Sequence, residues 1–148
     1  MSGILVGVDG SGHSRRALGW AIREAALRHL PLTVLTIREP SVYPATEVLW
    51  AVHDYSENSP DDLEAMQIAV QEIVEKIEAD TGLTVPSVTV NAACGGVARE
   101  LIKASRYADL VVVGSRGSGG FAGLRLGSVA GQVLHHASCS VAVIPPAR

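Results

Sequence analysis

The stretch ADLVVVGSRGSGGFAGLRLGSV, which runs from Ala108 to Val129, decides how this chain folds. Its apolar run from Leu110 to Gly114 predicts a strand buried on both faces, as the central strands of parallel sheets are. A glycine-rich loop follows, and a helical pattern begins at Ser128. Glycines let backbone N–H groups approach a ligand closely, and a helix begins with the positive end of its dipole. Strand, loop and helix together are typical of a site for an anion.

Length and composition predict one compact domain over residues 1–148, because 47% of the residues are hydrophobic and only 18% are charged. The net charge of −3, without a basic run, argues against a nucleic-acid partner. Two cysteines, Cys94 and Cys139, lie far apart and form no CxxC motif, so no zinc site or disulfide framework is expected. The first residues show neither a signal peptide nor a membrane span, and the expected location is the cytoplasm.

Strands and helices alternate along the chain. Apolar runs predict strands over Ile4–Val8, Leu32–Ile37, Val85–Ala92, Leu110–Gly114 and Ser140–Ile144. Helical spacing predicts helices over Ser14–Ala26, Ser59–Asp80, a short segment from Val97, and Ser128–His136. Ser11 or Ser14 is the expected N-cap of the first helix, and residues 38–58 are unassigned apart from a helix option at Thr46–His53. This alternation predicts an α/β fold with an open, parallel five-stranded sheet and helices on both faces.

In such a sheet, ligands bind at the carboxyl ends of the strands, where the strand order reverses. The candidate loops are Asp9–Ser11, Ile37–Glu39, Ala92–Gly96 and Gly114–Leu126. An acid after the first strand, facing a glycine loop, suits a nucleotide, because a carboxylate accepts from ribose hydroxyls and backbone amides donate to phosphates. Asp9 is about equally well explained as a turn-forming or helix-capping residue, since Asp-Gly is a common turn dipeptide.

Other polar residues have ordinary alternatives. Arg116 and Arg125 lie in the glycine loop, where they either pair with phosphates or are exposed to solvent. The pair His135–His136 is expected to contact the negative end of a helix dipole and not a metal. Cys94 is expected to be a small buried residue, with pocket lining as the alternative.

Several motifs are excluded. The chain has no GxxxxGK[ST] motif, so it is not a P-loop protein. The GxGxxA match at Gly117–Ala122 is rejected, because the helix begins later and no acid follows about twenty residues downstream. His13 lies near the expected site, but no neighbouring nucleophile makes it a catalytic base. No Ser–His–acid or Cys–His set is present.

A resemblance to a known protein family rests on four segments: ILVGVDGS (Ile4–Ser11), CGGVARELIKAS (Cys94–Ser105), ADLVVVGSRG (Ala108–Gly117) and LGSVAGQVLHHASCSVAVI (Leu126–Ile144). Together they resemble the universal stress protein family over nearly the whole chain. The resemblance implies the strand order 3-2-1-4-5. Gly114, Gly117 and Gly127-Ser128 fit the spacing G-2x-G-9x-G-[ST], which implies the ATP-binding branch of the family.

The resemblance also implies the residues that surround ATP. The ribose side would be held by Gly7, Val8 and Asp9, with Asp9 also near a Mg²⁺ ion bound through the nucleotide. Ile37 would pack near adenine. The phosphates and sugar would be surrounded by Val113, Gly114, Arg116, Gly117, Gly127, Ser128 and Val129. One departure is the third-strand loop, Gly95-Gly96-Val97, where the family often has G-x-P.

The function expected is an ATP-binding universal stress protein that regulates a stress response and is not an enzyme beyond slow ATP hydrolysis at most. The alternatives are a slow ATPase or phosphotransferase, and a member of the family that binds cyclic AMP. The chain offers donors for phosphate but no base to position a nucleophile. The strand Ser140–Ile144 is uncharged and lies at an edge in the family order, so a homodimer through this strand is also expected.

Overall fold

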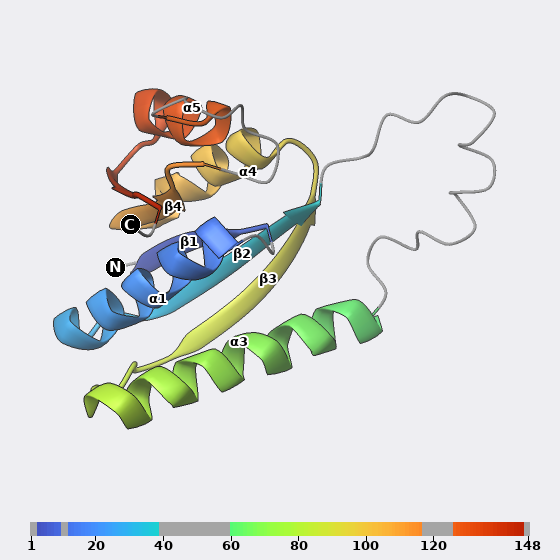
Figure 1. Cartoon of the computed structure of the whole chain (residues 1–148). Coiled ribbons are helices and arrows are strands. Elements are labelled where there is room, and N and C mark those ends of the chain that lie inside the picture. The colour runs from blue at the N-terminus through green and yellow to red at the C-terminus, as the bar shows by residue number, and fades with distance from the viewer. Residues whose placement is uncertain (1–2, 10–11, 39–59, 117–125, 147–148) are drawn as a thin grey trace.

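The structure is a computed structural model of the chain that describes residues 3–9, 12–38, 60–116 and 126–146. Five parallel strands form one sheet in the order β3-β2-β1-β4-β5 (Figure 1). They are β1 (Ile4–Val8), β2 (Leu32–Arg38), β3 (Val88–Cys94), β4 (Leu110–Gly114) and β5 (Ser140–Ile144). The predicted fold class and strand order are confirmed. The order reverses between β1 and β4, so the two strands that flank the predicted nucleotide loops are neighbours.

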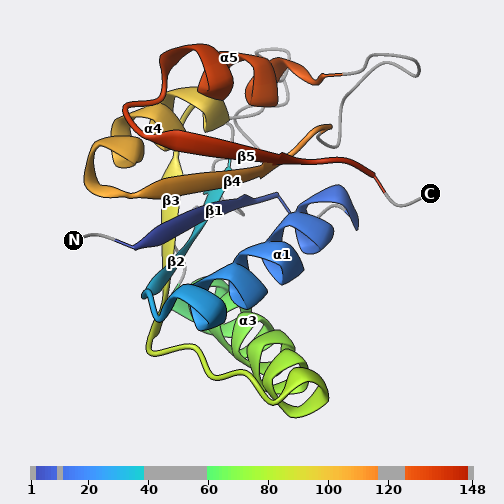
Figure 2. The same ribbon diagram turned by 90° about the vertical axis from the view of Figure 1, so that its left-hand side faces the viewer.

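Helices cover both faces of the sheet (Figure 2). On one face lie α1 (Gly12–Arg28) and α3 (Pro60–Thr81); on the other lie α4 (Val97–Ala104), a 3₁₀ turn η1 (Ser105–Tyr107) and α5 (Ser128–His136). Successive strand residues point to opposite faces, so Val112 packs in the α1/α3 core and Val111 in the α4/α5 core, both fully buried. This is why the central strands read as continuous apolar runs.

Some predicted boundaries are wrong. The helix α1 begins at Gly12, so Ser14 is buried inside the helix and is not its N-cap, while Ser11 lies outside the described residues. The strand β3 begins at Val88 and not at Val85, because the Val85 N–H donates to the Glu78 carboxylate (2.8 Å) and is not available to a strand partner. The helix option at Thr46–His53 lies outside the described residues.

The ends of two elements follow local chemistry. Gly82 ends α3, as predicted, with a φ of +71° that favours glycine. At the other end of the sheet, Asp109 clamps β4 to the residue before β1. Its N–H donates to the Gly3 carbonyl (2.8 Å), and its carboxylate accepts from the Gly3 N–H (2.9 Å). Within the described residues, no helix has both the length and the hydropathy that crossing a bilayer requires.

Candidate functional site

The two central strands separate at their carboxyl ends. The β1–β4 pairing runs from Ile4 opposite Leu110 to Val6 opposite Val112. Beyond that point, β1 stays paired with β2 as far as Val8, and β4 stays paired with β5. The last two residues of β1 therefore pair with β2, and the last two of β4 pair with β5, so these ends of β1 and β4 do not pair with each other. This is the crevice that a reversal of strand order creates, and ligands of open α/β sheets bind there.

Two glycines beside this crevice lack side chains for different reasons. A Cβ on Gly114 would lie 3.2 Å from the His13 carbonyl oxygen and 3.3 Å from that of Arg116, so Gly114 lets the start of α1 approach the backbone at the end of β4. A Cβ on Gly7 would lie 3.0 Å from a methyl carbon of Leu101, on the α4 side of the sheet. Gly7 therefore serves the packing of α4 against β1, a role that the sequence analysis did not assign to it.

The helix α5 points its amino end at the same edge of the sheet. Gly127 is its N-cap in an extended conformation, and among the described residues no side chain forms a cap hydrogen bond. The Gly127 N–H donates to the Ser115 carbonyl (2.6 Å), which fixes the start of α5 beside the carboxyl end of β4. The hydroxyl of Ser128 accepts from the Gln132 side chain (3.0 Å) and does not cap the helix. The first N–H groups of a helix have no intrahelical partner, so this end suits an anion.

Ser115 is the residue that the sequence analysis missed. Its N–H donates to the Ile144 carbonyl (2.8 Å) while its own carbonyl accepts from Gly127, so it joins β4, β5 and α5. Its side chain is buried, yet neither the Ser115 hydroxyl nor the buried Arg116 Nε has a hydrogen-bond partner among the described residues. Buried polar atoms nearly always have partners. A hydroxyl and a guanidinium nitrogen left over beside a helix amino end fit an anionic ligand such as a nucleotide phosphate.

The other predicted site residues lie at the same edge or in its walls. Asp9 is exposed and directly follows β1, and Gly127 and Val129 start α5. The side chain of Ile37 is 6% exposed and belongs to the α4/α5 core, so β2 would present its backbone to an adenine. Gly117 and Arg125 lie outside the described residues.

The remaining candidates lie away from this set or differ from expectation. Cys94 is exposed, so its prediction as a buried residue is wrong; it is the last residue of β3, which lies at one edge of the sheet that the described strands form. His135 and His136 are exposed at the carboxyl end of α5, as the dipole argument expects. No cluster of metal-ligating side chains occurs in the described ranges. Burial raises the pKa of the Cys139 thiol, but this residue lies at the opposite, amino end of β5.

The loop that departs from the family pattern keeps its shape without proline. Gly95 has a φ of +142°, which only glycine adopts readily, and Gly96 is the N-cap of α4. Val97 is therefore the first residue of the helix, the position where proline is tolerated and often found. With valine in place of the family's proline, the start of α4 stays in place, and only the backbone of this loop gains conformational freedom.

Proteins of known sequence are similar to this chain over nearly all of its length. A universal stress protein of Mycolicibacterium smegmatis is 38% identical over 144 residues, covering 96% of this chain and 47% of that protein. One of Mycobacterium tuberculosis is 37% identical over 161 residues, covering 99% of this chain and 50% of that protein. The chain thus spans about half the length of the curated relatives it matches.

Three solved structures are similar over nearly their whole length. UspA from Lactobacillus plantarum has a TM-score of 0.79 at 22% identity, with 95% of each chain covered. A universal stress protein in complex with cAMP has a TM-score of 0.66 at 27% identity, covering 95% of this chain and 94% of that one. An Arabidopsis thaliana family protein with AMP bound has a TM-score of 0.59 at 19% identity, covering 97% and 91%.

The family model described as the universal stress protein family matches residues 1–145. The match includes every strand of the sheet and both loops of the crevice. This chain therefore belongs to the universal stress protein family.

Proposed function

We propose that this protein binds ATP in the crevice between β1 and β4 and acts as a nucleotide-responsive regulator. The observation that carries the proposal is the pair of unpartnered buried groups, Ser115 Oγ and Arg116 Nε, beside the uncapped amino end of α5. The relative at 27% identity holds cAMP, and the more distant Arabidopsis protein shows that the same fold accommodates AMP. These ligands support an adenine nucleotide, and the number of phosphates is the part that experiment must decide.

Each part of the crevice offers a group that suits one part of ATP. The amino end of α5 and the Arg116 guanidinium suit the phosphates, because a helix dipole and a delocalised cation both favour negative charge. The carboxylate of Asp9 suits the ribose hydroxyls or a Mg²⁺ ion carried by the phosphates, since Mg²⁺ prefers oxygen ligands. Longer phosphate chains place more charge at α5, so we expect ATP to bind more tightly than AMP or cAMP.

Calorimetric titration of the purified protein with ATP, AMP and cAMP, each with and without Mg²⁺, tests this order. The informative variant is Gly127→Val, which would put a branched side chain at the N-cap and obstruct the backbone approach. Gly131→Ala is the matched control, because a Cβ there would meet only a Leu126 methyl at 3.7 Å. We expect Gly127→Val to lower ATP affinity about tenfold or more while Gly131→Ala leaves it unchanged. Equal affinities in both variants would remove α5 from the site.

We propose further that the chain hydrolyses ATP slowly at most. None of the described residues at the carboxyl ends of the strands forms a nucleophile–base pair that would activate water. Incubation with ATP and measurement of released phosphate test this: sustained turnover well above the spontaneous rate would make the protein an ATPase or phosphotransferase.

A homodimer through β5 is part of the proposal. The strand pairs with β4 on one side only, and its four apolar residues are half-buried, with Val141 and Val143 on the α5 side and Ala142 and Ile144 on the α1 side. Unpaired edges of this kind invite a second strand. We expect self-association in sedimentation equilibrium, and Val143→Asp should weaken it by removing the β5 contact while ATP affinity is retained. A monomeric parent protein would overturn this interface.

We also place the protein in the cytoplasm without a nucleic-acid partner. Support comes from the two cysteines, which show no paired framework in the sequence, and from the net charge of −3. Cell fractionation and a gel-shift assay with generic DNA and RNA test the two statements.

A further inference from the structure

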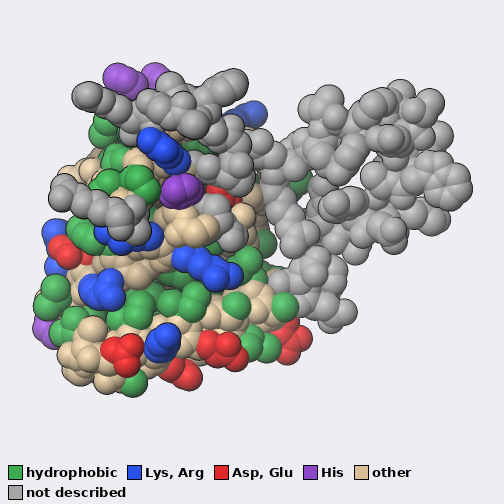
Figure 3. All heavy atoms as spheres, in the orientation of Figure 1, with side chains coloured by type: hydrophobic (Ala, Val, Ile, Leu, Met, Phe, Trp, Pro, Cys, Tyr) green, Lys and Arg blue, Asp and Glu red, His purple; other side chains and the backbone are tan. Residues whose placement is uncertain are grey.

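The helices α1 and α3 lie side by side on one face of the sheet and carry opposite charge (Figure 3). Four arginines and one glutamate give α1 a net charge of +3, whereas seven acids and one lysine give α3 a net charge of −6. Within the described part of the chain, the one ion pair of these helices is Arg28 with Glu24, inside α1. The four arginines of α1 are exposed, and so are four of the five acids of α3 whose side chains the structure describes, so the two helices present a positive strip and a negative strip to solvent.

Helix stability does not account for the acids of α3. Acidic side chains stabilise the first turn of a helix and are unfavourable near its carboxyl end, where the dipole is negative. Yet Glu75, Glu78 and Asp80 lie in the last two turns of α3, and its last turn has no basic residue. Glu78 accepts from the Val85 N–H, and Glu75 accepts from the Gln71 side chain (3.3 Å), but among the described residues no cation pairs with any of the three acids. The exposed acids thus cost stability in the isolated chain, which is understandable if they meet positive charge from outside.

Gly19 is a second feature that the single chain does not explain. It lies in the interior of α1, where glycine is a poor helix former. A Cβ there would lie 3.6 Å from an Arg23 nitrogen and 3.8 Å from the Ile77 Cδ1, which are ordinary contacts that would tolerate alanine. Glycine on a helix surface lets another backbone approach closely. Leu27 and Ile68, which are 61% and 53% exposed on the two helices, add apolar surface to the same layer.

From these observations we propose that a second copy of this chain docks on the α1/α3 face, with α1 of each copy over α3 of the other. Both helices connect parallel strands and so run in the same direction. We place a two-fold axis parallel to these helices, midway between the α1/α3 faces of the two copies. Rotation about this axis puts the positive strip of each copy on the negative strip of the other and closes the assembly.

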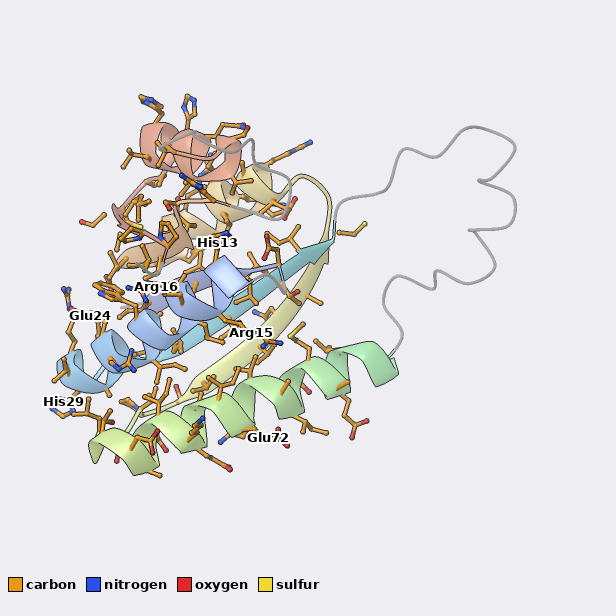
Figure 4. All side chains as sticks on the ribbon, in the orientation of Figure 1. His13, Arg15, Arg16, Glu24, His29 and Glu72 are labelled. Atoms are coloured by element: carbon orange, nitrogen blue, oxygen red, sulfur yellow. The ribbon has the colours of Figure 1, made fainter. Side chains whose placement is uncertain are left out.

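The contact between Gly19 and Ile77 gives the register of this pairing. It places Gly19 and Ile77 at the same height along the helix axes. Rotation about an axis parallel to the helices leaves the height of every residue unchanged. To within about one helical turn of 5.4 Å, Arg23 then lies opposite Asp80 of the second copy and Arg16 opposite Glu75. Arg16, which Figure 4 labels on α1, already donates its Nε to the Pro145 carbonyl (2.9 Å), which holds it in place. Arg23 and Asp80 are both exposed and are the better pair to test.

The layer is large enough for a specific interface. Helices of 17 and 22 residues are about 26 and 33 Å long, and each is about 10 Å wide. Their joint outline is about 600 Å² per copy, so the total of about 1,200 Å² exceeds the roughly 1,000 Å² that a biological interface needs. Because charge dominates it, we expect the association to weaken when salt rises from about 0.1 M to about 1 M, which shortens the screening length from about 10 to about 3 Å.

Charge reversal and mixing test the proposal. Arg23→Glu and Asp80→Arg are each expected to weaken self-association about tenfold in sedimentation equilibrium, since like charges then face each other. An equimolar mixture of the two variants is expected to associate as the parent does, because each mixed contact joins opposite charges. Arg99→Glu, at an exposed arginine of α4 on the other face, is the matched control and should change nothing.

The same series in the Val143→Asp background separates this face from the β5 edge, because only the β5 contact is lost there. If either reversal changes folding, Gly19→Gln replaces it: this variant should raise the melting temperature and yet weaken association. The proposal is supported if association is sensitive to salt, is weakened by each charge reversal and is restored when the two variants are mixed. A mixture as weak as its components, or single reversals that associate like the parent, overturns it whatever the fate of the β5 dimer.

Discussion

Two buried serines offer a direct test of how the candidate site is built. Ser105 and Ser115 are 1% and 5% exposed, so both hydroxyls are removed from water. The Ser105 hydroxyl donates to the Ile102 carbonyl (2.6 Å) and accepts from the Ser138 N–H (2.9 Å). The Ser115 hydroxyl has no partner among the described residues. Replacing each by alanine is the same chemical change, and we expect the two changes to have opposite effects.

The magnitudes follow from the hydrogen bonds. A buried hydroxyl without a partner costs about 1–3 kcal/mol, and Ser115→Ala removes this cost while losing a few packing contacts. We expect a net gain of about 1 kcal/mol in the free energy of unfolding, which raises the melting temperature by about 2–4 °C in a chain of this size. Ser105→Ala breaks two bonds and leaves a part-buried N–H unpaired, so we expect a loss of about 1–3 kcal/mol.

The assay is scanning calorimetry of nucleotide-free protein, followed by titration with ATP. If the Ser115 hydroxyl contacts the ligand, Ser115→Ala binds ATP about three- to tenfold more weakly although it is more stable. A melting temperature that falls in Ser115→Ala as it does in Ser105→Ala would refute the reasoning, because the hydroxyl would then be satisfied within the protein.

Two further predictions concern glycine packing and the acid after β1. Gly7→Ala should lower the free energy of unfolding by about 1–3 kcal/mol in urea titrations, because its methyl group would press on Leu101; unchanged stability would mean that α4 shifts freely. Asp9→Asn should reduce ATP affinity more than thermal stability. The reverse pattern, a lower melting temperature with unchanged affinity, would make Asp9 a turn residue instead.

Sequence reasoning predicted the sheet well, because its central strands are buried on both faces and therefore read as apolar runs. The run Leu110–Gly114 and the strand Ser140–Ile144 have the predicted bounds. The start of β3 was wrong for a reason that is not local. The Val85 N–H is taken by Glu78, a side chain seven residues earlier, and no pattern of hydrophobicity contains that bond.

The candidate site could be predicted from the sequence only at the residues that belong to the family motif. Gly114 and Gly127 stand out by spacing, but Ser115 does not, since a serine after a strand usually looks like an exposed loop residue. Its importance arises from three elements that meet at its backbone. Gly7 has a further role that the motif does not contain: a Cβ there would press on Leu101, so glycine at this position serves the packing of α4. Such roles depend on which side chain arrives from another element, and spacing along the chain does not contain that information.

The central place of β1 also has a consequence for how the chain is made. During synthesis, β1 leaves the ribosome before the other strands of this sheet, and its β4 side stays unpaired until β4 has been made. Gly3 and Asp109, which clamp that junction, are 106 residues apart. At synthesis rates of about 5–20 residues per second, this side of β1 stays open for roughly 5–20 s. A nascent chain that stops before β4 thus displays an apolar edge from Ile4 to Val8, which favours aggregation or capture by a chaperone.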